Sequence, residues 1–311
     1  MSSSRSKDRP GFSIRVKKDF RENWPVYLML LPVLAWFFVF SYMPIGGVVM
    51  AFENYKFGKG LLGSQWVGLK YFKEFFSSYY FGRLLRNTLA LSFYDLCVSF
   101  PASIIFALLL NEVRSKFFKK TLQTVSYLPY FISMVVVCGL VKIFTESGGI
   151  LSLISQALGG SSNLLSSNGA FRSIIVGSNV WQNLGYGSII YISALSSIDQ
   201  ELYEAARIDG AGRWKQTLYI TLPGIVATIM IMLIMRMGQL MTVNYQKIIL
   251  LYSPAVYEVG DVISTFVYRK GLLESNYSYS AAVDLFNSVI NMVILIMANR
   301  ISRKYTEAAL F

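Results

Sequence analysis

The chain alternates long apolar segments with short polar ones. The apolar segments occupy about residues 25–52, 85–110, 123–144, 171–195, 223–243 and 279–298. A helix of about 20 apolar residues crosses the hydrocarbon core of a bilayer. The pattern therefore predicts an all-α integral membrane protein with six transmembrane helices. The composition agrees, since 54% of the 311 residues are hydrophobic and the mean hydropathy is positive.

The ends of the chain suggest two regions. Residues 1–25 are rich in Lys and Arg with serines between them, and predict a basic cytoplasmic tail that contacts anionic membrane lipid. Residues 26–311 form the predicted six-helix transmembrane domain. The first apolar segment is too long for the core of a signal peptide, so we expect it to remain as a span. Pro129 predicts a kink in the third span.

The basic residues set the predicted orientation. The chain carries a net charge of +12, and the segments assigned to the inside hold more Lys and Arg than those assigned to the outside. This bias places both termini and residues 196–222 in the cytoplasm. The charge is spread over loops rather than gathered on a soluble domain, so we expect no nucleic-acid partner.

The composition also excludes several kinds of site. The chain has no histidine, and its two cysteines, Cys97 and Cys138, lie in apolar segments. They are interpreted as small buried hydrophobic residues rather than a disulfide or metal pair. No metal site, no nucleophile–base arrangement and no G-x-x-x-x-G-K-[ST] phosphate-binding loop is present in the sequence, so we expect neither an enzyme nor an ATPase.

Residues 197–223 are polar and helix-forming, although they lie between two apolar segments. Ser197 and Gln200 have the spacing of a capping box, and Gly210 stands where a left-handed residue would end a helix. One face of this helix would carry Leu202, Ala205, Ala206 and Asp209. Pattern alone allows a helix lying on the lipid surface as well as a docking helix.

The full spacing favours docking. Glu204-Ala205-Ala206, then Gly210, Ile220 and Leu222-Pro223, with Asp209 and Ala211 around the glycine, resembles the EAA loop of permease subunits of ATP-binding-cassette (ABC) importers. Ala227 stands where the family often has a further proline. The resemblance implies that residues 196–222 are a cytoplasmic coupling loop. Its contacts with an ATPase would come from Glu204, Ala205, Ala206, Asp209, Gly210 and Ala211.

The last third of the chain has a second resemblance. Residues 243–252, 261–269 and 298–304 are similar to the permeases of complex-polysaccharide importers, a branch of the maltose-type carbohydrate permeases. The resemblance implies a homologous second permease subunit, two ATPase subunits and an extracellular solute-binding protein in a bacterial cell membrane. ATP and Mg would be bound by the ATPase subunits, and no cofactor by this chain.

Polar residues inside spans are costly in lipid and mark a candidate oligosaccharide pathway. Aromatic rings stack on sugar rings, and amides bond to their hydroxyls. Such side chains may equally join helices to one another. The predicted pathway consists of Asn179, Trp181, Asn183, Tyr186, Arg236, Gln239, Asn244, Gln246, Asn287 and Asn291.

Arg236 is the clearest of these residues, because a buried guanidinium needs a carboxylate, water or an anionic ligand. One interpretation pairs it with Asp95 or Asp284. The other gives it the carboxylate of an acidic, polysaccharide-derived oligosaccharide imported by alternating access. Lysines on the external side, such as Lys56 and Lys70, favour an anionic solute or an acidic face on the binding protein.

Two rival functions remain at this point. An ion-coupled secondary transporter would use Asp95, Arg236 and Asp284 as a charge relay, but it leaves the EAA loop unexplained. A membrane receptor or scaffold would need no polar pathway.

Overall fold

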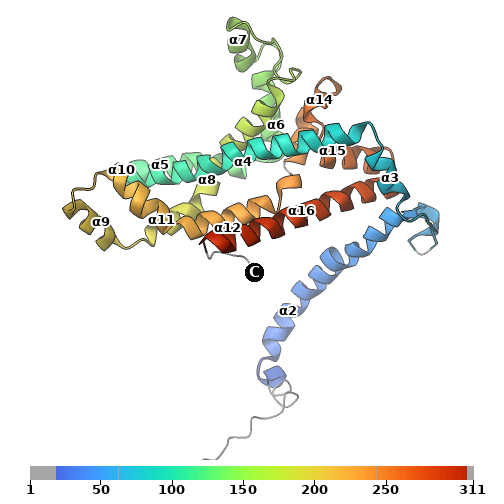
Figure 1. Ribbon diagram of the computed structural model, residues 1–311, viewed down its shortest axis with the longest axis horizontal. Helices are drawn as coiled ribbons and strands as arrows, with labels where there is room; N and C mark the ends of the chain where they lie inside the picture. The colour runs from blue at the N-terminus through green and yellow to red at the C-terminus, as the bar shows by residue number, and fades with distance from the viewer. Residues whose placement is uncertain (1–18, 62, 243, 307–311) are drawn as a thin grey trace, which may run out of the picture.

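The computed structural model describes residues 19–61, 63–242 and 244–306, and within them the chain is almost entirely helical. Most of the predicted basic tail, residues 1–18, lies outside the described residues. The long helices α4, α8, α12 and α16 run side by side, with α9 at one end of the bundle and α3 at the other (Figure 1). These two ends are called the α9 end and the α3 end.

The first half of the chain contains α2 (Trp24–Phe37), η1 (Phe38–Tyr42), η2 (Met43–Phe52), β1 (Glu53–Asn54), η3 (Phe57–Lys59), β2 (Gln65–Trp66), α3 (Lys70–Phe76), α4 (Tyr80–Glu112), α5 (Lys116–Tyr127), η4 (Leu128–Phe131), α6 (Met134–Thr145) and α7 (Ile150–Ala157). The second half contains α8 (Phe171–Ser196), α9 (Gln200–Ile208), α10 (Arg213–Gln216), η5 (Thr217–Thr221), α11 (Leu222–Gly224), α12 (Val226–Met237), η6 (Leu240–Thr242), α13 (Tyr245–Leu251), η7 (Pro254–Val256), α14 (Tyr257–Gly260), α15 (Ile263–Tyr268), η8 (Arg269–Leu273) and α16 (Tyr277–Thr306). β1 and β2 pair antiparallel, with Glu53 opposite Trp66.

Length and hydropathy identify four helical segments in the described residues that can cross a membrane: Trp24–Phe52, Tyr80–Glu112, Met134–Ala157 and Tyr277–Lys304. A fifth is formed if Arg213–Gly224 and Val226–Met237, which meet at 60°, make one bent span. The predicted fourth span is α8, whose 26 residues suffice in length but include many polar side chains. The all-helical membrane fold is confirmed, whereas the six-span topology stays a prediction.

The predicted third span differs from the structure. Instead of one kinked helix, α5 ends at Tyr127, Pro129 lies in η4, and Ser133 starts a new helix by accepting a hydrogen bond from Val136 N. Proline has no backbone N–H to donate to the preceding turn, so the helix is interrupted at Pro129. At the start of α6 the first backbone N–H groups have no carbonyl partner, and the Ser133 hydroxyl accepts a hydrogen bond from one of them. The short helix α7 follows α6 in the chain, before α8 begins.

The body of the bundle is built on contact between α4 and α8. Two glycines of α8 allow this helix to approach its neighbours. A Cβ on Gly185 would lie 2.2 Å from the Ser126 carbonyl oxygen of α5, and one on Gly187 would lie 2.9 Å from Ser103 Oγ of α4. Small residues at helix contacts let backbones approach closely, as is common in membrane proteins.

The first apolar segment extends away from this body as an arm (Figure 1). No residue of α2 or η1 is buried. η2 contacts α16, and its Ala51 joins the buried cluster around Phe75 and Tyr279 at the α3 end. The arm is therefore attached to the bundle at one end only.

Candidate functional site

A polar cavity of about 110 Å³ lies between α4 and the break that follows α12. It is lined by Ser92, Asp95, Leu96, Ser99, Phe100, Arg236, Gln239, Leu240, Thr242 and Asn244. Three predicted pathway residues, Arg236, Gln239 and Asn244, meet here. The cavity can bond hydroxyl and carboxylate groups because it combines a guanidinium, amides, hydroxyls and a carboxylate.

The carboxylate of Asp95 is held on the α4 side of this cavity. Asp95 is 3% exposed and accepts hydrogen bonds from Ser99 Oγ at 2.8 Å and from Asn179 Nδ2 at 2.6 Å. Asn183 Nδ2 in turn donates to Asn179 Oδ1 at 2.7 Å. Asn179 therefore joins α8 to α4, and the half-buried Asn183 continues the amide row one turn further.

Arg236 is exposed and lines the cavity, but no ion pair links it to Asp95 or Asp284 in the described part of the chain. Asp284 lines a different cavity, next to Tyr268 and Tyr277. The predicted structural ion pair is thus not formed. Arg236 is available for a ligand in this conformation.

Two of the remaining predicted residues, Asn287 and Asn291, support the break between α12 and α13. Asn291 accepts a hydrogen bond from Met241 N at 3.3 Å and donates to the Gly238 carbonyl, while Asn287 Nδ2 donates to the Met241 carbonyl at 3.3 Å. Asn244 adopts a left-handed conformation at φ 45°. Gln246 is exposed and reaches the Tyr245 hydroxyl at 3.4 Å. Asn287 and Asn291 therefore brace the cavity wall by satisfying freed backbone groups.

Replacing Asn291 with alanine should lower the free energy of unfolding by about 1–2 kcal/mol, because two backbone groups of the break lose their partner. Thermal unfolding of the purified protein measures the change. Ser288→Ala, at an exposed position on the same helix, is the control. Equal stability of the two variants would contradict the bracing role.

The two predicted aromatic residues of α8 lie in different surroundings. Tyr186 stacks on Tyr130 with ring centroids 3.7 Å apart, and both rings are partly exposed. Trp181 instead lines an apolar cavity of about 550 Å³ between α6, α7 and α8. The structure therefore does not bring Trp181 together with Arg236.

The predicted coupling helix is α9, and none of its residues is buried. The predicted capping box is wrong: Asp199, not Ser197, caps the helix by accepting from Glu201 N at 3.0 Å, and the Ser197 hydroxyl donates to the Ala194 carbonyl. Capping requires the side chain to sit beside the first free N–H groups, and here the helix starts two residues later than predicted. Gly210 has φ 74°, which confirms the predicted left-handed end.

Two contacts connect this loop to the bundle. The Tyr203 hydroxyl lies 3.0 Å from Thr221 Oγ1, and Arg213 pairs with Glu112, at the end of α4, at 3.6 Å. Ala206, three residues after Tyr203, is half-buried, whereas Leu202, Ala205 and Asp209 are exposed. The free face of α9 thus contains most, but not all, of the predicted docking face.

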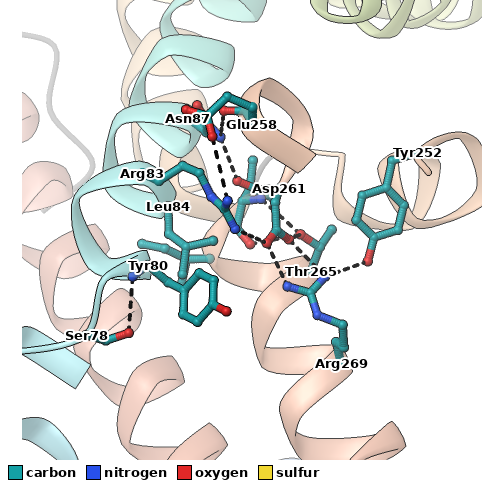
Figure 2. A network of polar contacts seen from close by, with 12 residues as sticks. Ser78, Tyr80, Arg83, Leu84, Asn87, Tyr252, Glu258, Asp261, Thr265 and Arg269 are labelled. Atoms are coloured by element: carbon teal, nitrogen blue, oxygen red, sulfur yellow. Dashed lines mark hydrogen bonds and ion pairs between the residues drawn. The ribbon is translucent and has the colours of Figure 1, made fainter. Parts of the chain in front are cut away.

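Sequence reasoning missed two groups of polar residues. Lys247 is fully buried, and its Nζ has no hydrogen-bond partner within the described residues. A network at the α3 end joins Arg83 of α4 and Arg269 of η8 to Glu258 and Asp261 (Figure 2), and Arg172 of α8 contacts it through Asn87. In this network burial raises the pKa of Tyr252 to about 12, so its hydroxyl stays protonated beside Arg269. The only sign of this network in the sequence was the position of its arginines near the ends of predicted spans.

The helical bundle, the polar cavity and the exposed loop helix define a membrane permease. A profile of the family of binding-protein-dependent transport system inner membrane components matches residues 99–307. The chain belongs to this family, which confirms the family to which the EAA stretch pointed.

Relatives cover nearly the whole chain. It is 41% identical to "Protein LplB" of Bacillus subtilis (strain 168), over 94% of this chain and 92% of that one. It is 39% identical to the polygalacturonan/rhamnogalacturonan transport system permease protein YteP of the same organism, over 92% and 90%. A chain of a solved bacterial ABC transporter involved in the import of the acidic polysaccharide alginate shares 41% identity and superposes with a TM-score of 0.86, over 94% and 99%. The same transporter in complex with an alginate pentasaccharide-bound periplasmic protein gives a TM-score of 0.86, over 95% and 100%.

Proposed function

We propose that this chain is a membrane-spanning subunit of an ATP-driven importer that moves acidic oligosaccharides inward by alternating access. The observation that carries the proposal is the place of Arg236, a guanidinium with no ion-pair partner among the described residues, in a polar cavity of a chain whose solved relative is involved in the import of an acidic polysaccharide. A guanidinium binds a carboxylate with two parallel hydrogen bonds, and the amides and hydroxyls around it suit the rest of a sugar.

The size of the cavity supports a moving pathway. A volume of about 110 Å³ admits a few water molecules but no oligosaccharide chain. Passage of a sugar therefore requires the helices around η6 to separate. The break between α12 and α13, held by side-chain amides rather than by continuous helix, is the point where such movement costs least.

The proposed energy source is a separate pair of ATPase subunits that binds ATP and Mg, while this chain binds neither. The exposed face of α9 would dock on one of them, which places the α9 end, with both termini, in the cytoplasm. The Lys and Arg bias of the loops supports this orientation. The α3 end would then receive the solute-binding protein, in keeping with the periplasmic protein bound to the alginate transporter.

The proposed second partner in the membrane is a homologous permease. The arm formed by α2 and η1 supports this, because none of its residues is buried and apolar side chains such as Leu31 and Phe38 are largely exposed. A second permease placed against the arm and the polar cavity would enclose the pathway between the two subunits.

The ion-coupled alternative is not favoured. A charge relay needs its members in one connected site, yet Asp95 and Arg236 line one cavity and Asp284 lines another. The family match also supports import coupled to a binding protein.

Replacing Arg236 with glutamine tests the substrate class. Uptake of trigalacturonate by the reconstituted complex should fall about ten-fold, the size expected from the loss of a charge-assisted hydrogen bond, while uptake of its neutral methyl ester should change little. Arg236→Lys, which keeps the charge, should retain part of the activity. An equal loss for both solutes would assign Arg236 a structural role and remove the support for an acidic substrate.

A further inference from the structure

The polar network at the α3 end carries more positive than negative charge. Figure 2 shows its inner part, with Arg83 from α4 and Arg269 from η8 around Asp261. Arg86 from α4 and Arg172 from α8 also belong to it, but its only carboxylates in the described residues are Glu258 and Asp261. Two positive charges are therefore in excess at a place where helices, rather than bulk water, surround most of the groups.

The inner half of the network is compensated. Asp261 is fully buried and pairs with Arg269 at 2.7 Å and with Arg83 at 3.6 Å. Thr265 Oγ1 donates a further hydrogen bond to the same carboxylate at 2.9 Å. These contacts fix α15 against α4. They engage both oxygens of the Asp261 carboxylate, which therefore does not pair with Arg86 or Arg172.

The outer half is not compensated. Arg172 is half-buried and contacts no carboxylate in the described part of the chain; it donates to the Val259 carbonyl at 3.1 Å and to Asn87 Oδ1 at 2.8 Å. Arg86 has a side chain 62% exposed, and its one carboxylate partner, Glu258 at 3.0 Å, is shared with Arg83. Both guanidinium groups keep N–H donors free, because each has five.

The local backbone adds to the positive potential. Arg172 is the second residue of α8, so this cation lies at the positive end of a helix macrodipole. Asn87 is buried between α4 and α14, since its Nδ2 donates to the carbonyls of Glu258 and Asp261. The Asn87 side chain holds the Arg172 guanidinium in place, although the excess positive charge around it is unfavourable. A protein gains from such an arrangement when an anion occupies it.

We infer that Arg86 and Arg172 form a second carboxylate-binding site, at the α3 end, which receives a uronate group of the oligosaccharide before it reaches Arg236. The inference rests on the proposed function and extends it to a pair of residues at the α3 end, where the solute would enter. Two guanidinium groups next to a fixed amide suit one planar carboxylate, with the neighbouring hydroxyls of the sugar left to water.

The test uses the complete complex of this chain, its second permease and ATPases in lipid nanodiscs or vesicles, with the binding protein. Arg172→Gln and Arg86→Gln are compared with wild type for trigalacturonate and for its methyl ester, and each variant is normalised to wild type for each solute. Lys73→Gln, an exposed cation on α3, is the matched control. The affinity of the unloaded binding protein for the complex is measured in parallel.

We expect the trigalacturonate concentration for half-maximal uptake to rise about ten-fold in Arg172→Gln and Arg86→Gln, as for loss of one charge-assisted bond. The methyl ester, the Lys73→Gln control and the affinity of the unloaded binding protein should stay within about two-fold. Arg172→Lys, which keeps the charge, should restore part of the apparent affinity for trigalacturonate lost in Arg172→Gln. A misfolded variant would not show this restoration.

Four results would overturn the inference. Equal losses for acid and ester would indicate a structural or lipid-binding role. A loss of affinity for the unloaded binding protein would show that the carboxylate belongs to that protein. Unchanged uptake in both variants, with wild type still preferring the acid, would remove the site but keep the proposed function. If wild type itself does not take up trigalacturonate, the proposed function fails and the inference fails with it.

Discussion

Ala205→Arg is expected to reduce ATP-driven uptake about ten-fold or more while leaving the permease folded and in the membrane. Ala205 lies on the exposed face of α9, opposite the side held by Tyr203 and Thr221. An arginine there would place a long charged side chain in the proposed contact with the ATPase, and an unpaired charge buried in an interface is strongly unfavourable. Co-purification of the ATPase subunits and uptake in vesicles measure the effect.

Two further variants separate docking from loop shape. Gln200→Arg adds the same charge on the other side of α9, beside a polar cavity that includes Tyr203 and Arg207, and should keep most activity. Gly210→Pro should uncouple the complex, because proline cannot adopt φ 74°, whereas Gly212→Ala at φ −67° should be tolerated. Normal ATPase binding and uptake by Ala205→Arg and Gly210→Pro would rule out the coupling role of α9.

Gly185→Ala is expected to destabilise the bundle by about 2–3 kcal/mol, a large effect for one methyl group. The added Cβ would lie 2.2 Å from the Ser126 carbonyl oxygen, and a backbone atom cannot rotate away as a side chain can. The helices α5 and α8 would have to separate. The loss should appear as a lower midpoint of thermal unfolding and a broader elution profile in detergent.

The control is the same substitution elsewhere on the same helix. Gly177 has no atom within 4 Å of the position of an added Cβ. Gly177→Ala should therefore raise stability by about 0.5–1 kcal/mol through helix propensity alone. If the two variants had the same stability, the close approach of α8 to α5 would not be a determinant of the fold.

The long apolar segments and the loop helix were predictable, because each depends on local pattern. The bounds of α8 match the predicted span of 171–195 within one residue, and Gly210 ends α9 as expected. The third span was predicted less well, since hydropathy does not report whether a helix continues. Pro129 signalled a kink, but the complete break also depends on Ser133 acting as a cap, which periodicity does not detect.

The candidate site was predictable only as a set of residue types. Sequence spacing placed Asn287 and Asn291 on one face of a helix, but it did not indicate whether that face contacts a sugar or protein backbone. In the structure both side chains form hydrogen bonds with the Met241 backbone in η6. Trp181 and Tyr186 are five residues apart, so they point in different directions from α8, one to an apolar cavity and one to Tyr130. Contacts between segments far apart in sequence decide these roles.

The arm formed by α2 and η1 separates membrane insertion from folding. It is the first apolar segment to be synthesised, yet it contributes no buried residue to the bundle. The free energy of unfolding of the bundle therefore depends on the elements from η2 onward, and a melting curve would not register the arm. In the proposed complex the second permease, rather than the folding of the bundle, would therefore fix the place of the arm.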